Sequence, residues 1–232
     1  MMKKYNRSPI WMRCLIILCA LIVTGISIIC ADSPNSRWRW YYSSSTTSMY
    51  YDTQTLKYDD INQIAKIWTK DVDAKGFKYS ERLITISYRY KTFSVEKTVF
   101  YKNGYPQVYQ MVQTIKPIVP DSPMESLANS VGAIYHQSAI YPSGPNRWRW
   151  IHSTDKYSMY IASGCEIYYP ETNMHLVWIK RTSIYGGTYV EGYYCNFSNE
   201  TIMNSGKPRT IIPESDDEYI YDAAKDLFSH PD

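Results

Sequence analysis

The sequence predicts an α+β fold made of two tandem small domains, each an antiparallel β-sheet meander packed against a C-terminal α-helix. Three observations lead to this prediction. A tryptophan-rich stretch occurs twice, most segments alternate polar and apolar residues with the period of a strand, and each copy ends in a capped amphipathic helical pattern. Strands followed by one helix are typical of layered α+β folds.

The duplication is defined by Arg37-Trp38-Arg39-Trp40, which returns 110 residues later (147 − 37) as Arg147-Trp148-Arg149-Trp150. Two tripeptides recur at the same offset: Ser48-Met49-Tyr50 with Ser158-Met159-Tyr160, and Trp68-Thr69-Lys70 with Trp178-Ile179-Lys180. This period is too long for a solenoid repeat and suits a small domain. We therefore expect domain 1 over residues 33–136, a Pro- and Gly-containing linker over 137–146, and domain 2 over 147–232.

The repeated stretch has the alternation of a strand. Successive side chains of a strand point to opposite faces, so Trp38 and Trp40 share one face and the arginines the other. We expect the indoles to anchor a small core, because each buries a large apolar area. The alternative function of the stretch is a cationic stripe that grips an anionic partner. Its candidate binding residues are Arg37, Arg39, Arg147 and Arg149.

Strands are predicted by alternation and by turn clusters between them. In the first copy they cover residues 38–51 (two strands joined at 43–47), 61–70, 83–91, 93–101 and 107–113. In the second copy they cover residues 148–151, 158–162, 175–180, 183–194 and 200–203, with Gly186-Gly187 as a turn inside 183–194. Asn103-Gly104 is the strongest hairpin signal in the chain.

A helix follows the strands in each copy. Ser122 is placed to cap the first helix, Pro123 takes its first position and Glu125 completes a capping box. The opening Ile118–Glu125 is matched by Ile211–Glu218 at an offset of 93 (211 − 118). The second copy is therefore 17 residues shorter (110 − 93), and we expect the loss in the strand pair around residues 83–101.

The amino terminus is predicted to be a targeting segment that engages the membrane. A basic stretch precedes an apolar run from Cys14 to Ile29, and residues 1–31 read as a signal peptide cut after Ala31. The run also approaches the length of a bilayer span, so an uncleaved signal anchor is an alternative. Lipid attachment at Cys30 is a third. All three export the rest of the chain, to the periplasm, the outer membrane surface or the medium.

Charge and cysteine content bound the function further. Four of the 25 basic residues lie in the leader, which leaves 21 against 22 acidic residues beyond Ala31. This balance gives no concentrated basic face, so we expect no nucleic-acid partner. Cys165 and Cys195 are the only cysteines of the exported part, and an even pair in an oxidising compartment predicts a disulfide. The alternative, a catalytic cysteine, has no supporting motif.

Catalytic and metal-binding patterns do not stand out in the sequence. The four histidines are widely spaced, and no nucleophile elbow, phosphate loop or nucleotide fingerprint occurs. We therefore expect no enzymatic activity, no cofactor and no metal. The 24 tyrosines exceed what small cores need, and tyrosine is enriched at interfaces. Tyr88 and Tyr90 are candidates for a binding face, the alternative being a half-exposed sheet that uses tyrosine as a strand former.

Four features together resemble the surface-adhesin protein E-like domain of bacterial exported proteins. These are an opening tryptophan strand, a central strand ending in Trp-x-Lys (Trp68-Thr69-Lys70 and Trp178-Ile179-Lys180), a strand pair turned by a glycine, and the closing helix of Ile118–Glu125 and Ile211–Glu218. The resemblance covers nearly the whole exported chain, twice. It implies a small sheet packed on a helix, exposed at the cell surface or in the periplasm and without catalysis. The founding adhesin binds host matrix proteins and can dimerise, which makes both a matrix protein and a homodimer expected partners.

We therefore expect an exported, non-catalytic binding module that recognises a protein or glycan partner through a sheet face or edge. The alternative function is a periplasmic envelope enzyme or enzyme inhibitor with its site between the two domains.

Overall fold

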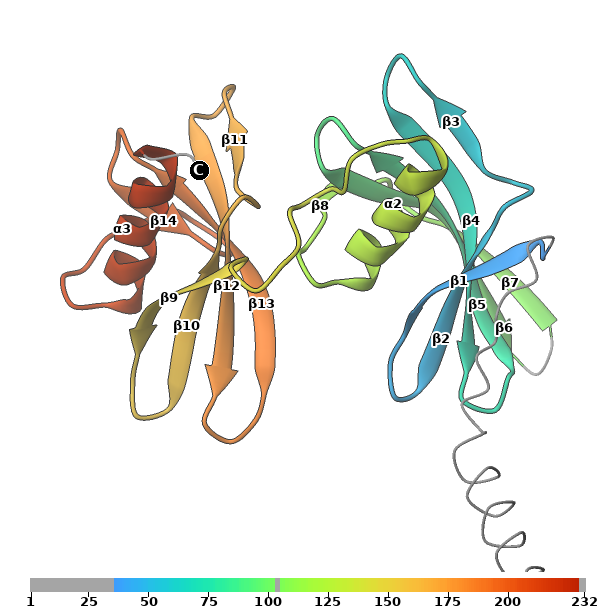
Figure 1. The fold of residues 1–232 in the computed structure, drawn as a ribbon, viewed down its shortest axis with the longest axis horizontal. Coiled ribbons are helices and arrows are strands. Elements are labelled where there is room, and N and C mark those ends of the chain that lie inside the picture. The colour runs from blue at the N-terminus through green and yellow to red at the C-terminus, as the bar shows by residue number, and fades with distance from the viewer. Residues whose placement is uncertain (1–35, 103–104, 230–232) are drawn as a thin grey trace, which may run out of the picture. The chain divides into compact units, whose positions relative to one another are not determined.

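The described part of the chain forms antiparallel β-sheets with two helices (Figure 1). The computed structural model describes residues 36–102 and 105–229. Both sheets belong to one compact unit, Arg37–Asp232. The antiparallel sheets and the helix that closes each copy confirm the coarse fold prediction. The predicted leader, residues 1–31, and the Asn103-Gly104 turn lie outside the described residues.

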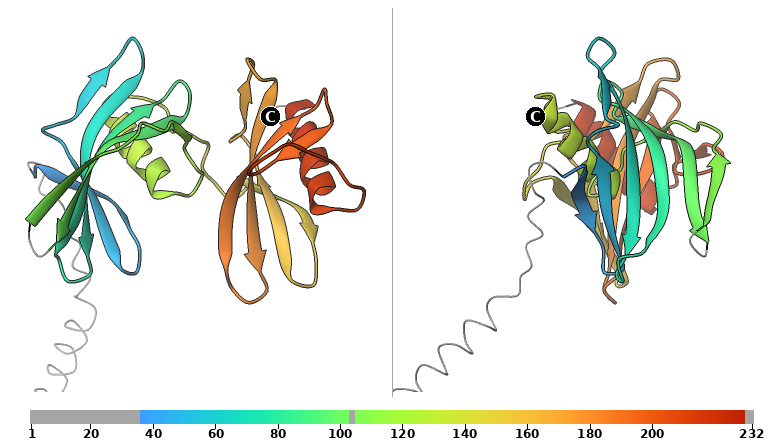
Figure 2. Two further views of the ribbon diagram at one scale, coloured as in Figure 1. Left: turned by 180° about the vertical axis from the view of Figure 1, so that it is seen from behind. Right: turned by 90° about the vertical axis from the view of Figure 1, so that its right-hand side faces the viewer.

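The first sheet has the strand order β1-β2-β4-β5-β6-β7, with β3 paired to β4 and β8 paired to β6 (Figures 1 and 2). Its strands are β1 (Trp38–Ser43), β2 (Thr47–Asp52), β3 (Lys57–Asp59), β4 (Ile64–Asp73), β5 (Lys78–Ser87), β6 (Thr92–Lys102), β7 (Tyr105–Gln110) and β8 (Lys116–Pro117). Strands β1, β2, β4, β6 and β7 match the predicted segments within a few residues, whereas β5 begins five residues and ends four residues before the predicted segment 83–91. The short strands β3 and β8 were not predicted, because two or three residues give no periodic signal.

The second sheet repeats the plan in the order β15-β14-β13-β12-β10-β9, with β11 paired to β12. Its strands are β9 (Trp148–Ser153), β10 (Tyr157–Ala162), β11 (Ile167–Tyr169), β12 (Met174–Ser183), β13 (Thr188–Asn196), β14 (Thr201–Met203) and β15 (Arg209–Thr210). The predicted strands at residues 148–151, 158–162, 175–180 and 200–203 are confirmed. The segment 183–194 is divided between β12 and β13 by a turn that includes Gly186-Gly187, as predicted.

Both helices begin where the sequence predicts. Helix α2 (Pro123–Ile134) is capped by Ser122, whose Oγ accepts the Glu125 N–H (3.2 Å). The Glu125 carboxylate accepts the N–H of Asp121 (2.7 Å), one residue before the serine. Helix α3 (Asp216–Ser229) begins with the same contacts among Glu214, Ser215 and Glu218. The free N–H groups at the N-terminus of each helix are therefore satisfied by a capping box whose residues recur in both copies.

The length difference between the copies lies later than predicted. In both copies a short final strand pairs with the strand that follows the long central pair, β8 with β6 and β15 with β14. In the first copy β6 continues beyond this pairing to Lys102, and β7 returns before β8 begins at Lys116. In the second copy only residues 204–208 separate β14 from β15. The first copy thus carries an extra hairpin, built from the second half of β6 and from β7.

Neither opening tryptophan of the first copy, Trp38 or Trp40, belongs to the core, contrary to the expectation that the indoles anchor it. The register of β1 against β2 shifts between Trp40 and Tyr42, and Tyr41 is buried. Trp40 is 52% exposed and its counterpart Trp150 is 59% exposed. The shift follows Trp40, so Trp38 and Trp40 still share one face as predicted, but they pair with Asp52 and Tyr50 on the face opposite buried Tyr51. Alternation shows which residues share a face and not which face is buried.

Candidate functional site: the uncovered face of the first sheet

The two sheets differ in how their faces are covered. In the first sheet Ala65, Ile67 and Thr69 of β4 are buried in the core, and the Tyr88 hydroxyl reaches helix α2 by donating to the Ala128 carbonyl (2.9 Å). The intervening residues of β4 point to the opposite face, since side chains alternate along a strand. Those residues, Lys66, Trp68 and Lys70, are only partly buried.

In the second sheet both faces are covered. On β12, Val177 and Ile179 belong to a cluster with the apolar face of helix α3. Trp178 faces the other way and lies in a second cluster with Ile140 and Tyr141 of the connecting segment. The Tyr141 hydroxyl donates to the Ile118 carbonyl (2.6 Å). The predicted linker is therefore packed over this face of the second sheet, whereas the matching face of the first sheet is open.

The residues at matching positions fit this difference. At the 110-residue offset, Lys66 corresponds to Leu176. On the neighbouring strand, Glu81 lies opposite Lys70, whereas Val190 lies opposite Lys180. Polar side chains on the first sheet are thus replaced by apolar ones on the second. An apolar face is buried and a polar one is solvated, as transfer free energies require.

Gly192 shows how closely the second face is packed. It lies opposite Trp178, and a Cβ at this position would meet Leu176 Cδ1 at 2.9 Å and Trp178 Cζ3 at 3.1 Å. The corresponding residue opposite Trp68 is Leu83. The indole of Trp178 is therefore seated against bare backbone, whereas Trp68 stands beside a full side chain.

The open face of the first sheet is hollowed around Trp68. A cavity of about 190 Å³ and another of about 470 Å³ share Trp68 and Thr55 in their lining, and we call the two together the Trp68 groove. The first cavity is also lined by Arg37, Trp38, Asp52 and Glu81, and the second by Gln54, Lys57, Lys66 and Leu83. A lining of tryptophan side chains with a few positively and negatively charged groups is typical of a recognition site.

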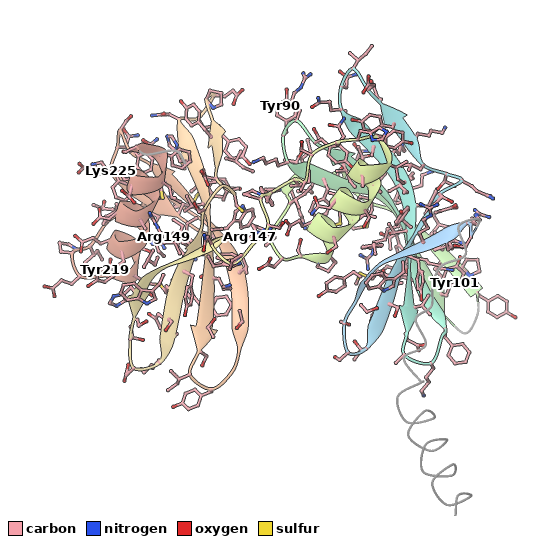
Figure 3. The ribbon with its side chains drawn as sticks, viewed as in Figure 1. Tyr90, Tyr101, Arg147, Arg149, Tyr219 and Lys225 are labelled. Carbon is pink, nitrogen blue, oxygen red and sulfur yellow. The ribbon has the colours of Figure 1, made fainter. Side chains whose placement is uncertain are left out.

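Several polar groups of the groove are held in place. Arg37 donates to Asp52 Oδ2 from Nε (3.0 Å) and Nη2 (2.7 Å). Burial acts to raise the pKa of Asp52, but hydrogen bonds from Arg37 and from the Gln54 N–H hold it below its ordinary value. Glu81 accepts the Tyr101 hydroxyl (2.9 Å; Tyr101 is labelled in Figure 3). Asp52 is therefore a fixed anion at neutral pH, beside an oriented glutamate.

The lysine of each Trp-x-Lys motif has the same position in both copies. The Lys70 ammonium lies 4.4 Å from the Trp38 ring centroid and 5.2 Å from that of Tyr50. Lys180 repeats this over Trp148 (4.3 Å) and Tyr160 (5.6 Å). Cation–π contacts of this kind stabilise a half-buried lysine. Because the contact occurs on the open and the covered face alike, it serves the fold rather than one ligand.

The exposed tryptophans are also fixed by a repeated network. Trp40 Nε1 donates to Ser43 Oγ (2.8 Å), which lies 3.0 Å from Ser48 Oγ. In the second copy Trp150 Nε1 donates to Ser153 Oγ (2.9 Å), which lies 2.8 Å from Ser158 Oγ. Both indoles are thus oriented although half of each is in solvent.

The four candidate arginines do not form one cationic stripe. Arg37 is bound to Asp52, and Arg39 is half-buried in β1. Arg149 forms a surface ion pair with Asp226 (2.8 Å). The Arg147 side chain (labelled in Figure 3) is buried and forms an ion pair with Glu125 in the first turn of helix α2.

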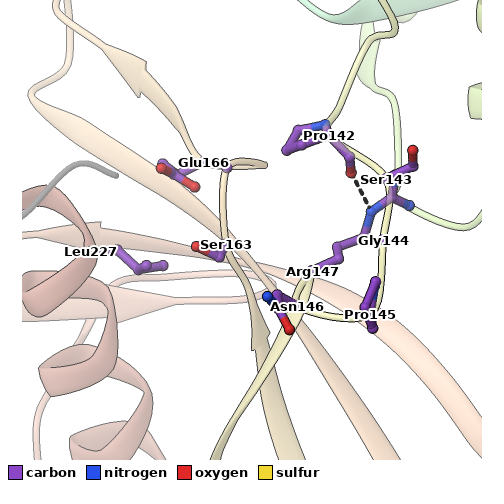
Figure 4. A pocket seen from close by; sticks show the side chains of 10 residues that line it. Pro142, Ser143, Gly144, Pro145, Asn146, Arg147, Ser163, Glu166 and Leu227 are labelled. Carbon is purple, nitrogen blue, oxygen red and sulfur yellow. Dashed lines mark hydrogen bonds between the residues drawn. The ribbon is translucent and has the colours of Figure 1, made fainter.

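Arg147 and its counterpart Arg37 bind acidic residues at different places in the chain. Asp52 pairs with Arg37, but the residue 110 positions later is Ala162. Arg147 instead binds Glu125 (2.8 Å) and Asp121 (2.6 Å) of the α2 capping box. Its Nε donates to the Pro142 carbonyl (2.7 Å), as Figure 4 shows. The repeated arginine therefore binds a residue of its own sheet in the first copy, whereas in the second copy it binds the capping box of the helix that precedes it.

The two candidate tyrosines are separated by the end of β5. Tyr88 is a core residue, and burial raises its pKa above the ordinary value. Tyr90 lies in the following turn and is exposed (Figure 3). Tyr88 is therefore unavailable to a partner, and Tyr90 alone of this pair can contact one.

A separate cavity of about 430 Å³ lies where the connecting segment meets the second sheet (Figure 4). It is lined by Pro142, Ser143, Gly144, Pro145, Asn146, Arg147, Ser163, Gly164, Glu166 and Leu227. Its two charged residues are Arg147, which is committed to Glu125, and Glu166. This lining contains no histidine or cysteine that could serve as a base or nucleophile.

The predicted disulfide between Cys165 and Cys195 is wrong, since both are free and buried. Cys165 lies in the cluster of Trp178 and Tyr141, and Cys195 in the cluster on the α3 side. The two thiols are therefore on opposite faces of the second sheet, which a disulfide cannot bridge. Burial raises the pKa of each thiol to about 12, which also argues against a reactive cysteine.

His175 lies in an aromatic box at the end of α3. Its ring centroid is 4.3 Å from that of Phe228, 4.5 Å from Phe197 and 4.6 Å from Tyr168. Its Nδ1 is buried without a hydrogen-bond partner among the described residues. Burial lowers the pKa of His175 below its ordinary value.

This box predicts acid sensitivity. The unfolded chain protonates His175 near its ordinary pKa of about 6.5, whereas the folded protein resists protonation until a lower pH. The free energy of unfolding should therefore fall as the pH drops below about 6.5. Urea titrations between pH 7.5 and 5 should show a smaller fall for His175→Leu than for the wild type. Equal pH dependence would contradict the assignment.

Neither a family model nor a curated protein matches this chain. Membership of the protein E-like family therefore stays a prediction. In residues 36–102 and 105–229, no three His, Cys, Asp or Glu side chains gather so that they could hold a metal ion. No helix in the same described part is long and apolar enough to cross a bilayer.

Proposed function

We propose that this chain is an exported, non-catalytic binding protein of the cell envelope or surface, built from two tandem protein E-like domains. It recognises a protein or glycan partner, such as a host matrix component, through the Trp68 groove. The second domain has a structural role and does not bind the partner through the same face, because the connecting segment covers that face.

One observation carries the proposal: the same sheet face is hollow and partly solvated around Trp68 but buried around Trp178. Open faces that keep a tryptophan beside fixed charges have the features of interaction hot spots. The groove also contains no nucleophile paired with a base, so binding fits its chemistry better than catalysis.

The proposal is tested by replacing Trp68 with alanine in the full chain. Wild-type and variant proteins are applied to immobilised matrix proteins and to an array of purified glycans. Loss of a hot-spot tryptophan costs about 2 kcal/mol or more, so binding to the recognised probe should weaken at least about 30-fold.

The matched control is Trp150→Ala, which removes an exposed indole from the second sheet. It should bind like the wild type. Binding that survives Trp68→Ala unchanged, or that is lost equally in Trp150→Ala, would exclude the groove as the site. A wild-type chain that binds no probe would count against the proposed function itself.

A further inference from the structure

The extra hairpin of the first copy presents an unusual sheet edge. Strand β7 ends the first sheet, and the described chain places no strand beyond it (Figure 2). Tyr105 is 76% exposed, Val108 67% and Tyr109 48%, and the apolar character continues through Met111 and Val112. A soluble protein rarely leaves such a row uncovered unless it is an interaction site.

The charge of this edge narrows the choice of partner. Residues 105–115 include no Asp, Glu, Lys or Arg. Natural edge strands usually carry charges that prevent pairing with another chain. The second copy avoids the problem by having only residues 204–208 at the corresponding place. Two such uncharged strands do not repel each other electrostatically, and both are apolar. A second copy of the chain can therefore pair with this edge.

The backbone of β7 is arranged for such pairing. The Met111 N–H donates inward to the Glu96 carbonyl of β6 (3.1 Å). Inward and outward groups alternate along an antiparallel strand, so Val108 and Gln110 direct their N–H and C=O groups outward. Pro106 occupies an outward position too, where its missing N–H costs nothing to the β6 ladder.

We propose that β7 pairs antiparallel with β7 of a second copy, with Tyr109 at the two-fold axis. Val108 of one chain then exchanges both backbone hydrogen bonds with Gln110 of the other, and Gln110 of the first chain does the same with Val108 of the second. Pro106 limits the ladder at its outer ends. The two Tyr109 side chains become a directly opposed cross-strand pair.

This register also extends an existing aromatic contact. The Phe100 and Tyr109 rings are edge-to-face with centroids 5.7 Å apart. Pairing brings two such contacts together on one face of a continuous sheet. Because each chain uses its single β7 edge, the interface is isologous and closes at a dimer. The proposal does not depend on the Trp68 groove.

The first test places a cysteine on the axis. In the full chain, Tyr109→Cys should yield a disulfide-linked dimer on a non-reducing gel, because directly opposed residues have the separation that a disulfide needs. Tyr185→Cys, at a turn of the second sheet, is the control, because Tyr185 is more exposed than Tyr109 (89% against 48%) and a cysteine there is at least as accessible. Its cross-linked fraction should stay at the wild-type level and severalfold below that of Tyr109→Cys. Equal fractions in the two variants would overturn the proposed interface.

The second test exchanges charge at the same position. Full chains carrying Tyr109→Lys or Tyr109→Glu are co-expressed with two affinity tags and co-purified. Like charges directly opposite each other destabilise a strand pair and opposite charges stabilise it. Lys with Lys and Glu with Glu should lose co-purification, whereas Lys with Glu should restore it. A wild-type chain that fails to co-purify with itself, or homotypic pairs that co-purify as well as the mixed pair, would refute the dimer.

Discussion

Replacing Arg147 by methionine should lower the free energy of unfolding by about 3–5 kcal/mol, the usual cost of removing one partner from a buried ion pair. The side chains of Arg147 and Glu125 are 8% and 6% exposed. Without the guanidinium, the Glu125 carboxylate stays buried beside its capping contacts and has no cation. Urea denaturation at neutral pH measures the change.

Arg149→Met is the matched control, since Arg149 lies only two residues further along the chain, on strand β9. Its ion pair with Asp226 is exposed on both sides (44% and 53%), so the loss should stay below about 1 kcal/mol. Glu125→Gln in the Arg147→Met background should recover part of the stability, because glutamine keeps the capping box and removes the buried charge. Equal losses in Arg147→Met and Arg149→Met would show that the buried pair is not formed.

The second large effect is expected from Trp178→Ala. Trp178 is 3% exposed and packs against Leu176 and bare backbone at Gly192. Removing a buried indole typically costs about 3–5 kcal/mol. Trp68→Ala, at the matching position of the first sheet, should cost less because its ring borders open cavities.

The pair is measured by the same urea titration, with circular dichroism confirming that both variants retain strand content at zero denaturant. A larger loss for Trp68→Ala than for Trp178→Ala would contradict the assignment of the open and covered faces. It would also weaken the proposed function, because a fully packed Trp68 could not line a groove.

Local signals in the sequence were sufficient for the longer elements and their order, but not for the strands of two or three residues β3, β8, β11 and β15. Ser122 and Glu125 cap α2 as predicted, and the alternation around Ile84 and Ile86 does mark a strand with one buried side. Such features depend on residues close in the chain, whose spacing is visible without a structure.

The candidate site could be predicted only in part. Trp68 and Trp178 look identical in the sequence, and their different burial depends on Tyr141, which packs onto one face alone. The bulge in β1 and the opposite faces of Cys165 and Cys195 likewise follow from register. A single shifted residue reverses which face a side chain takes, so composition cannot reveal these relations. Polar Lys66 in place of Leu176 was a usable signal that the two faces differ.

Hydroxyl-radical footprinting of the full chain, read by mass spectrometry, tests the difference between the two faces most directly. Oxidation rates of Trp68 and Trp178 are compared in the same sample, with exposed Trp150 as the internal reference. We expect Trp68 to be oxidised readily, Trp178 to be protected, and Trp68 alone to become protected when the recognised matrix protein or glycan is added. Equal protection of Trp68 and Trp178 in the free protein would contradict an open groove on the first sheet.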